Sequence, residues 1–262
     1  MDWRRMWRRM WRRGWQGGWL LASLVLGCSA LADEPPTLTI LTELWPPYVM
    51  RSDNGELVGA DLELARAVLL QLGYRSEVRV LPWKRVLQQA RLKQGDAVLD
   101  VFYIEARQQW LHYPEEPLSH SGEVLFYPAD RRVKFEQLSD LKGLRIGVQA
   151  DYAYSPDFLA DKGVIRVAMT GDGNMIKQLH LMMAGRLDGV VLNERVGRYL
   201  LRTQGLQDQV LNGSRLLTDD NRNFLGFTRK PGHDQLAIQF SSALKAFKQT
   251  PAYQQLLARY HL

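Results

Sequence analysis

The sequence predicts an α/β fold of two lobes, each a mainly parallel sheet with flanking helices, with two hinge strands between them. Apolar strand-like segments alternate with amphipathic helical segments, this alternation occurs twice, and an extended segment stands on each side of its second occurrence. A chain that leaves one such unit, builds another and returns needs two crossings. With 262 residues, 46% of them hydrophobic, the chain is long enough to bury two modest cores.

The first unit follows the order strand, helix, strand, helix, strand. Strands are expected at residues 38–42, 77–81 and 97–101, and helices at 61–72 and 84–92. Asp61 is expected to cap the first helix, which stops at Gly73. This alternation is typical of a parallel sheet covered by helices.

The second unit repeats the pattern. Strands are expected at 144–148, 164–169 and 188–192, with helices after Pro156, before Gly185 and at 195–204. The middle helix carries an apolar stripe that includes Met175, Met182 and Met183, which we interpret as core packing.

The two extended segments, residues 122–128 and 224–229, are the expected hinge strands, and two more helices follow at 234–249 and 251–261. The resulting division is residues 37–124 plus 228–262 for the first lobe and 125–227 for the second. Ligands of such sheets bind outside the carboxyl ends of the strands, so two facing lobes form one cleft.

The first 32 residues are typical of a cleaved signal peptide. They combine an arginine-rich start, a short apolar run at 19–26 and the small-x-small site Ala30-Leu31-Ala32. A signal anchor is the alternative, but spanning a bilayer takes about 20 apolar residues. Cys28, the only cysteine, stands in a poor lipobox. We therefore expect cleavage after Ala32 rather than lipid attachment at Cys28.

The charge distribution argues against a nucleic-acid partner. Six arginines and one acid in residues 1–32 account for most of the net charge of +6, and the other residues carry 28 basic and 27 acidic side chains. Nucleic-acid binding needs basic charge clustered on one face. The five histidines show no metal-ligand spacing and there is no phosphate loop, so we expect no metal and no cofactor.

A set of motifs occurs in a characteristic order along the chain. The motifs are Trp45-Pro46-Pro47-Tyr48, Gly59-Ala60-Asp61-Leu62-Glu63-Leu64-Ala65, Pro82-Trp83-Lys84-Arg85, Arg107, Leu141-Lys142-Gly143-Leu144-Arg145-Ile146-Gly147-Val148 and Gly185-Arg186-Leu187-Asp188-Gly189-Val190-Val191. Over residues 37–262 the order resembles the extracellular solute-binding proteins of family 3, which serve polar amino-acid ABC importers. The resemblance implies a type II periplasmic-binding-protein fold, with one lobe built from both chain ends.

The resemblance also implies a ligand site between the lobes. Its residues would be Trp45, Tyr48, Trp83, Phe102, Arg107, Tyr152, Tyr154 and Asn193. Arg107 would clamp a ligand carboxylate, because a guanidinium presents a planar fork of donors. Trp45 and Trp83 would enclose the ligand between aromatic faces.

Three departures from the family pattern leave the ligand open. Phe102-Tyr103-Ile104 stands where relatives usually have a hydroxyl residue before the arginine, and Tyr152 and Tyr154 stand where small hydroxyl residues or glycine are common. Asn193 stands where relatives usually have the Asp that takes the α-amino group. Asn193 is equally suited to cap the helix that follows it. These departures favour an amino-acid-related ligand other than a standard free α-amino acid.

The expected function is that of a monomeric periplasmic protein that captures a small polar, amino-acid-like ligand and delivers it to an ABC permease in the inner membrane. Two alternatives stand beside it. One is a periplasmic dehydratase-like enzyme on the same fold, with Glu194 or Asp100 as its general acid. The other is an orphan ligand sensor that feeds no transporter.

Overall fold

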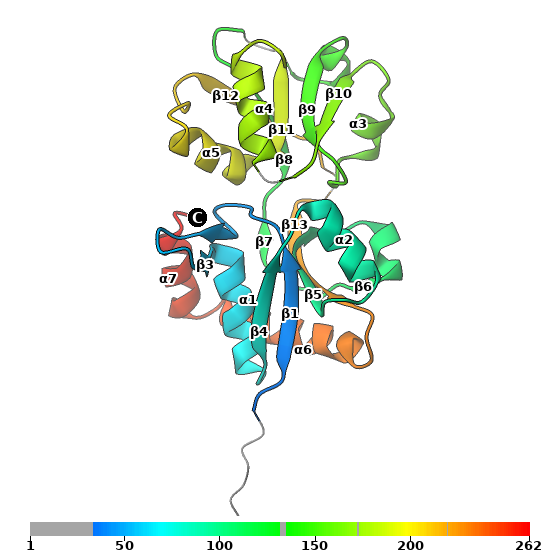
Figure 1. The fold of residues 1–262 in the computed structure, drawn as a ribbon, viewed down its shortest axis with the longest axis vertical. Helices are drawn as coiled ribbons and strands as arrows, with labels where there is room; N and C mark the ends of the chain where they lie inside the picture. The colour runs from blue at the N-terminus through cyan, green and yellow to red at the C-terminus, as the bar shows by residue number, and fades with distance from the viewer. Residues whose placement is uncertain (1–33, 132–134, 172, 219) are drawn as a thin grey trace, which may run out of the picture. The chain divides into compact units, whose positions relative to one another are not determined.

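Two mixed sheets organise the chain in a computed structural model, which describes residues 34–131, 135–171, 173–218 and 220–262 (Figure 1). The expected signal peptide, residues 1–32, lies outside the described residues. Within the described part, no helix is both long and apolar enough to span a bilayer. Residues 35–262 form one compact unit.

The first lobe is built on a sheet of order β4-β1-β5-β13-β6, with β7 paired to β13. Its strands are β1 (Thr37–Thr42), β4 (Arg75–Val80), β5 (Ala97–Phe102), β6 (Leu111–His112), β7 (Ser119–His120) and β13 (Arg222–Thr228). Strands β4, β1 and β5 run parallel as predicted, and β13 runs antiparallel to β5. The central strand β5 is buried along its whole length, whereas the edge strand β4 alternates exposed and half-buried residues.

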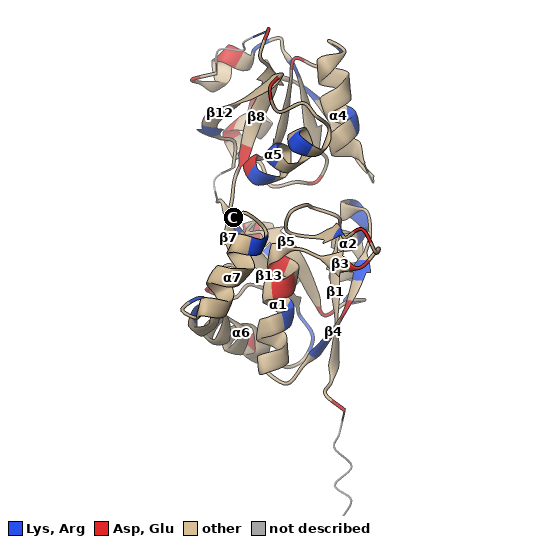
Figure 2. Cartoon of the chain, turned by 90° about the vertical axis from the view of Figure 1, so that its left-hand side faces the viewer, with Lys and Arg blue, Asp and Glu red and all other residues tan. Residues whose placement is uncertain are grey.

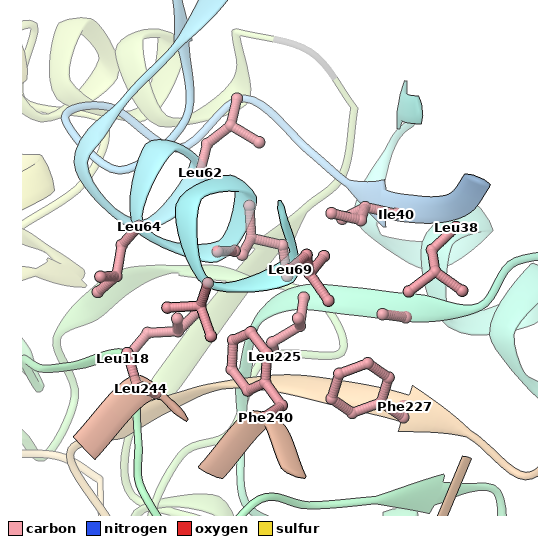
Figure 3. Packing of buried hydrophobic residues seen from close by; sticks show 14 of the residues in the cluster. Leu38, Ile40, Leu62, Leu64, Leu69, Leu118, Leu225, Phe227, Phe240 and Leu244 are labelled. Carbon is pink, nitrogen blue, oxygen red and sulfur yellow. The ribbon is translucent and has the colours of Figure 1, made fainter. Parts of the chain in front are cut away.

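Four helices and a small hairpin complete this lobe. They are α1 (Ala60–Gln71), α2 (Trp83–Arg91), α6 (His233–Phe247), α7 (Pro251–Arg259) and the hairpin β2 (Met50–Arg51) with β3 (Leu57–Val58), and a 3₁₀ turn spans Glu105–Gln109. Leu62 and Leu69 of α1 pack toward Ile40 of β1, while Phe240 of α6 meets Phe227 of β13 (Figure 3). All five are fully buried, and burial of each such side chain contributes roughly 1.5–3 kcal/mol.

The second lobe is built on a sheet of order β10-β9-β11-β8-β12. Its elements are β8 (Glu123–Pro128), β9 (Arg145–Gln149), α3 (Pro156–Ala160), β10 (Ile165–Met169), α4 (Asn174–Met183), β11 (Gly189–Asn193), α5 (Glu194–Thr203) and β12 (Val210–Leu216), and a 3₁₀ turn spans Leu138–Leu141. Core packing was predicted for the methionines of α4. Met175 and Met182 are buried in the core, and Met183 is only partly buried against it.

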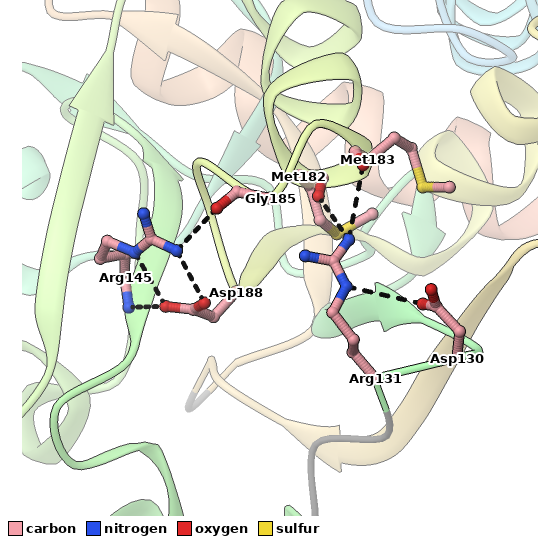
Figure 4. A network of polar contacts seen from close by, with 7 residues as sticks. All are labelled: Asp130, Arg131, Arg145, Met182, Met183, Gly185 and Asp188. Carbon is pink, nitrogen blue, oxygen red and sulfur yellow. Dashed lines mark hydrogen bonds and ion pairs between the residues drawn. The ribbon is translucent and has the colours of Figure 1, made fainter.

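A polar network explains why two of the sequence motifs carry an arginine and an aspartate (Figure 4). The backbone N–H and the guanidinium of Arg145 on β9 both donate to the Asp188 carboxylate, at 2.8 and 2.9 Å. The same guanidinium donates to the Gly185 carbonyl at 2.8 Å, and Arg131 donates to the Met182 carbonyl at 3.0 Å. These bonds fix the end of α4 and the start of β11 against the sheet.

The expected hinge strands are present as β8 and β13, but each is an integral strand of one sheet. Glu123 of β8 pairs with Asn193 in the second sheet, and Asn223 of β13 pairs with Phe102 in the first. Residues 222–227, expected in the second lobe, therefore lie in the first sheet, and residues 123 and 124 lie in the second. The chain crosses between β7 and β8 and again between β12 and β13.

Two local details differ from the sequence expectation. Helix α1 begins at Ala60 with Gly59 at its N-cap, so Asp61 lies inside the first turn and is buried instead of capping it. Strand β12 was not predicted, because its middle reads Asn-Gly-Ser, which is typical of a turn, and only Val210 of its seven residues is buried.

Candidate functional site

A pocket lies at the carboxyl ends of β1 and β5, beneath the loop that follows β9. It is lined by Thr42, Glu43, Trp45, Trp83, Leu99, Asp100, Phe102 and Arg107 from the first lobe and by Tyr152 and Ala153 from the second. Its position is the one expected for a ligand of two facing parallel sheets. Five of the eight site residues implied by the resemblance line it, namely Trp45, Trp83, Phe102, Arg107 and Tyr152.

The loop that carries Trp45 is fixed by the N-terminus of α1. The Ala60 and Leu62 N–H groups donate to the Pro47 and Tyr48 carbonyls at 3.1 and 3.3 Å. Gly59 has a φ of 141°, and a Cβ there would stand 2.1 Å from the Tyr48 carbonyl oxygen. Only glycine allows this approach, which explains the spacing between the first two sequence motifs.

Aromatic rings form two walls of the pocket. Trp45 stacks on Tyr48 with ring centroids 4.8 Å apart and meets the edge of Phe102 at 6.2 Å. Trp83, at the start of α2, donates from Nε1 to the Asp151 carbonyl at 3.2 Å, and its ring lies 6.0 Å from that of Tyr152. One wall is thus internal to the first lobe, and the other is completed by the second lobe.

Arg107 lies in the 3₁₀ turn after β5 and is only 5% exposed. Its Nη1 donates to the Phe102 carbonyl at 3.0 Å and its Nη2 to the Asp151 carbonyl at 3.1 Å. The guanidinium also lies 5.7 Å from the Trp83 ring centroid. Burial lowers the pKa of Arg107, but a guanidinium stays charged in proteins. The side chain is therefore held as an oriented cation whose donors face both lobes.

Two carboxyl groups, those of Glu43 and Asp100, also line the pocket. Asp100, near the end of β5, is 8% exposed, and apart from the neighbouring carboxyl of Asp61 its oxygens have no hydrogen-bond partner among the described residues. Burial and then the charge of Asp61 raise the pKa of Asp100 well above its ordinary value. Glu43 accepts a hydrogen bond from the Tyr152 hydroxyl at 2.5 Å, so it joins the two lobes. Neither acid was among the implied ligand-binding residues, and Asp100 was considered only as the general acid of the alternative enzyme.

Three of the implied site residues do not line the pocket. The Tyr48 side chain is fully buried behind Trp45. The Tyr154 hydroxyl accepts from the Gln149 N–H at 2.8 Å within the core of the second lobe. The Asn193 Oδ1 accepts from the Arg195 and Val196 N–H groups at 3.2 and 3.4 Å. Two roles were predicted for Asn193, ligand contact and capping of the following helix, and in the structure it caps the helix.

Five pocket residues were absent from the implied site: Thr42, Glu43, Leu99, Asp100 and Ala153. Thr42 and Glu43 carry one sequence signal, a polar residue at or just past the end of a buried strand, and Asp100 carries another, a charged residue inside an otherwise apolar strand. Leu99 and Ala153 carry no such signal, since an apolar side chain in a strand or loop is the ordinary case.

The two general acids considered for an enzyme lie in different places. Asp100 lines the pocket, whereas Glu194 lines a separate groove with three arginines of α5 and pairs with Arg198 at 2.9 Å. Elsewhere, Lys and Arg are interspersed with Asp and Glu along the helices and loops in view (Figure 2).

Comparison with curated proteins finds relatives across most of the chain. The histidine-binding periplasmic protein of Escherichia coli is 28% identical over 191 residues, covering 67% of this chain and 69% of the relative. The L-arginine-binding protein of Pseudomonas aeruginosa is 23% identical over 250 residues, covering 92% and 93%.

Comparison with solved structures shows the fold. An ancestral arginine-binding protein bound to arginine matches with a TM-score of 0.72 at 20% identity, covering 87% of this chain and 99% of the other. A histidine kinase sensor domain with similarity to periplasmic binding proteins matches with a TM-score of 0.74 at 21% identity, covering 87% and 97%. Both likenesses support the two-lobed α/β architecture.

The profile of the bacterial extracellular solute-binding proteins, family 3, matches residues 38–262, which include both lobes and every residue of the pocket. Since this match extends over far more than half of the sequence, the chain belongs to the bacterial extracellular solute-binding proteins, family 3.

Proposed function

We propose that the protein captures an amino-acid-like solute in the pocket between its lobes and delivers it to an ABC permease. The observation that carries the proposal is Arg107, a buried guanidinium oriented over the Trp83 ring at the carboxyl ends of the strands. A planar fork of donors suits a carboxylate, and aromatic walls suit the carbon stem of the ligand. Relatives named as histidine-binding and arginine-binding proteins support an amino-acid ligand.

The interlobe contacts supply a mechanism for capture. Trp83 and Arg107 each donate to the Asp151 carbonyl, at 3.2 and 3.1 Å, so two residues of the first lobe hold one loop of the second. We propose that opening frees the second donor of Arg107 for the ligand carboxylate. Closure then returns the loop over the bound ligand, which favours the closed state because the ligand makes more contacts there.

The test of this role is a comparison of two arginine variants. Arg107→Ala should weaken binding of the best ligand in a panel of amino acids at least about tenfold, since a hydrogen bond to a charged group contributes roughly 1.5–3 kcal/mol. Isothermal titration calorimetry measures this after a thermal-shift screen. Arg85→Ala, which removes an exposed arginine from α2, is the matched control and should bind normally. Equal affinities for the two variants would refute the anchoring role.

We further propose that the mature protein is a monomer in the periplasm, released by removal of residues 1–32. The small-x-small motif ending at Ala32 and the relatives named as periplasmic proteins support this location. Mass spectrometry of the protein recovered from the periplasm should give Asp33 as its first residue. A chain that keeps a lipid on Cys28 would contradict the proposed cleavage.

A further inference from the structure

Tyr113 is a partly buried tyrosine of the first lobe that is not among the residues lining the pocket. Its hydroxyl donates to the Phe102 carbonyl at 2.9 Å. The same carbonyl accepts from Nη1 of Arg107 at 3.0 Å. A carbonyl oxygen has two lone pairs, so it can accept both donors at once. The Tyr113 hydroxyl and the Arg107 guanidinium therefore meet at one oxygen atom beside the pocket.

The Tyr113 hydroxyl also acts on the guanidinium itself. Burial lowers the pKa of Arg107, and Tyr113 is the first of the groups that oppose this effect. Burial raises the pKa of the Tyr113 hydroxyl to about 12, although the charge of Arg107 acts in the opposite direction. At neutral pH the hydroxyl is therefore protonated and remains a donor to the carbonyl.

Tyr113 is held in place by the first lobe alone. It directly follows β6, which pairs with β13 through His112 and Phe227. Its ring meets the ring of Phe224 on β13 with centroids 5.4 Å apart, and that of Tyr103 with centroids 5.3 Å apart. Both contacts are edge-to-face, an arrangement that aromatic pairs favour. The hydroxyl is thus fixed to a sheet that does not move when the lobes separate.

Arg107, by contrast, lies in a short 3₁₀ turn and is supported from both lobes. Its Nη2 donates to the Asp151 carbonyl of the second lobe, at 3.1 Å. Opening of the lobes would remove this support and leave the Trp83 ring and the Phe102 carbonyl, both in the first lobe. A long side chain that loses contacts regains rotamer freedom. In the open state, the oxygen that Tyr113 also binds is the hydrogen-bond acceptor that remains for the guanidinium.

We propose that Tyr113 is a positioning residue for ligand capture, which acts through the Phe102 carbonyl to keep the Arg107 guanidinium in its carboxylate-binding orientation while the lobes are open. The inference rests on the proposed function and adds the residue that prepares the anchor before closure. Tyr113 does not touch the ligand in this role. Its hydroxyl raises the fraction of open molecules in which Arg107 is ready to bind, and the apparent affinity rises in proportion.

Stopped-flow tryptophan fluorescence tests the role, because Trp45 and Trp83 line the pocket. The probes are L-histidine and L-arginine, after which two relatives are named. Tyr113→Phe keeps the ring and should weaken binding about two- to tenfold, as expected for one hydrogen bond. The loss should appear in the association rate with dissociation unchanged, because a smaller competent fraction limits docking. Unchanged affinity, or a loss carried only by faster dissociation, would overturn the inference.

Two further variants separate positioning from a structural effect. Tyr103→Phe is the matched control, since it removes a hydroxyl from the neighbouring ring, where that hydroxyl accepts from Gln108 Nε2 at 2.6 Å. It should bind as wild type does. Added to Arg107→Ala, Tyr113→Phe should change the remaining affinity by less than about twofold, because the residue through which it acts is gone. An equal loss with and without Arg107 would refute the positioning role.

The orientation of Arg107 is measured without ligand, so the inference can fail independently of the proposed function. In protein with isotope-labelled arginine, nuclear magnetic resonance resolves the Nη–H signals of a hydrogen-bonded guanidinium, whereas free rotation averages them. The Arg107 signals, assigned by their loss in Arg107→Ala, should be resolved in wild type and Tyr103→Phe and averaged in Tyr113→Phe. Resolved signals in Tyr113→Phe would overturn the positioning role whether or not an amino acid binds. Absence of binding by every amino acid would instead overturn the proposed function.

Discussion

At the scale of single residues, the pocket is defined by charges that burial has altered. Asp100 has a φ of 57°, an uncommon conformation for which aspartate is among the better-suited residues, and the pairing of β5 with β13 is irregular at this point. Its pKa and that of Glu123 are both raised, mainly by burial. Burial thus favours the neutral form of the Asp100 carboxyl in the pocket and of the Glu123 carboxyl at the start of β8.

This burial predicts how the stability of the empty protein depends on pH. The pKa of Glu123 is raised from an ordinary 4.5 to about 8, so between these values the folded state binds more protons than the unfolded state. The free energy of unfolding should therefore fall as pH rises through this window. The raised pKa of Asp100 likewise lowers the free energy of unfolding as pH rises. Urea unfolding near pH 5.5 and near pH 8 measures the effect.

Glu123→Gln and Asp100→Asn provide the comparison, because each removes one titrating group and keeps the shape of the side chain. Each should flatten the dependence of unfolding free energy on pH. Glu56→Gln, an exposed acid in the turn between β2 and β3, should leave it unchanged. A dependence on pH that is the same in wild type and in both variants would show that Glu123 and Asp100 are ionised in the folded state.

At the scale of elements, α5 shows how one polar residue ends a strand and starts a helix. The Asn193 Oδ1 accepts from two N–H groups of the first turn and from the Ser121 Oγ at 2.7 Å. These bonds satisfy donors that a helix N-terminus leaves without partners, and they hold α5 to the first crossing of the chain.

Asn193→Ala should therefore affect stability more than binding. Loss of an N-cap costs about 0.5–2 kcal/mol of unfolding free energy. Because Asn193 does not line the pocket, ligand affinity should change by less than about threefold, well below the effect of Arg107→Ala. Thr250→Ala, which removes the side-chain cap of α7, is the matched control for stability. A tenfold loss of affinity confined to Asn193→Ala would restore Asn193 to the ligand site.

The elements show what the sequence was able to predict. Trp45, Trp83 and Arg107 were found because each follows a strand or stands at a motif position. The expectation that Asp61 caps α1 was wrong. An acid just before an apolar stripe is typical of an N-cap, and the close approach of the Tyr48 carbonyl to Gly59, which places the cap at Gly59, is visible only in the structure. Glu123 gave no signal, since an acid at the start of a strand is usually solvated. The groups it influences are distant in sequence: beyond the effect of burial, the charge of Glu123 raises the pKa of Tyr152 and Tyr154, 29 and 31 residues later in the chain.

At the scale of the whole molecule, the two lobes meet through few polar contacts, and these involve pocket residues. Trp83 and Arg107 donate to the Asp151 carbonyl, and Tyr152 donates to Glu43. A ligand entering the pocket must rearrange these polar contacts, whereas the apolar cluster that Trp45, Tyr48 and Phe102 share with the second lobe lies beside them. Binding and the balance between open and closed states are coupled through the same side chains.

Tyr152→Phe tests this coupling, because it removes one hydrogen bond to a carboxylate and keeps the ring. Such a bond contributes roughly 1.5–3 kcal/mol, so its loss should shift the balance about tenfold or more toward the open state. Small-angle scattering of the ligand-free variant should give a larger radius of gyration than wild type. Saturating ligand should reduce the radius of both proteins, at a higher ligand concentration for the variant. Tyr74→Phe, which alters a phenol outside the pocket, is the control. A radius that ligand leaves unchanged in wild type would contradict closure.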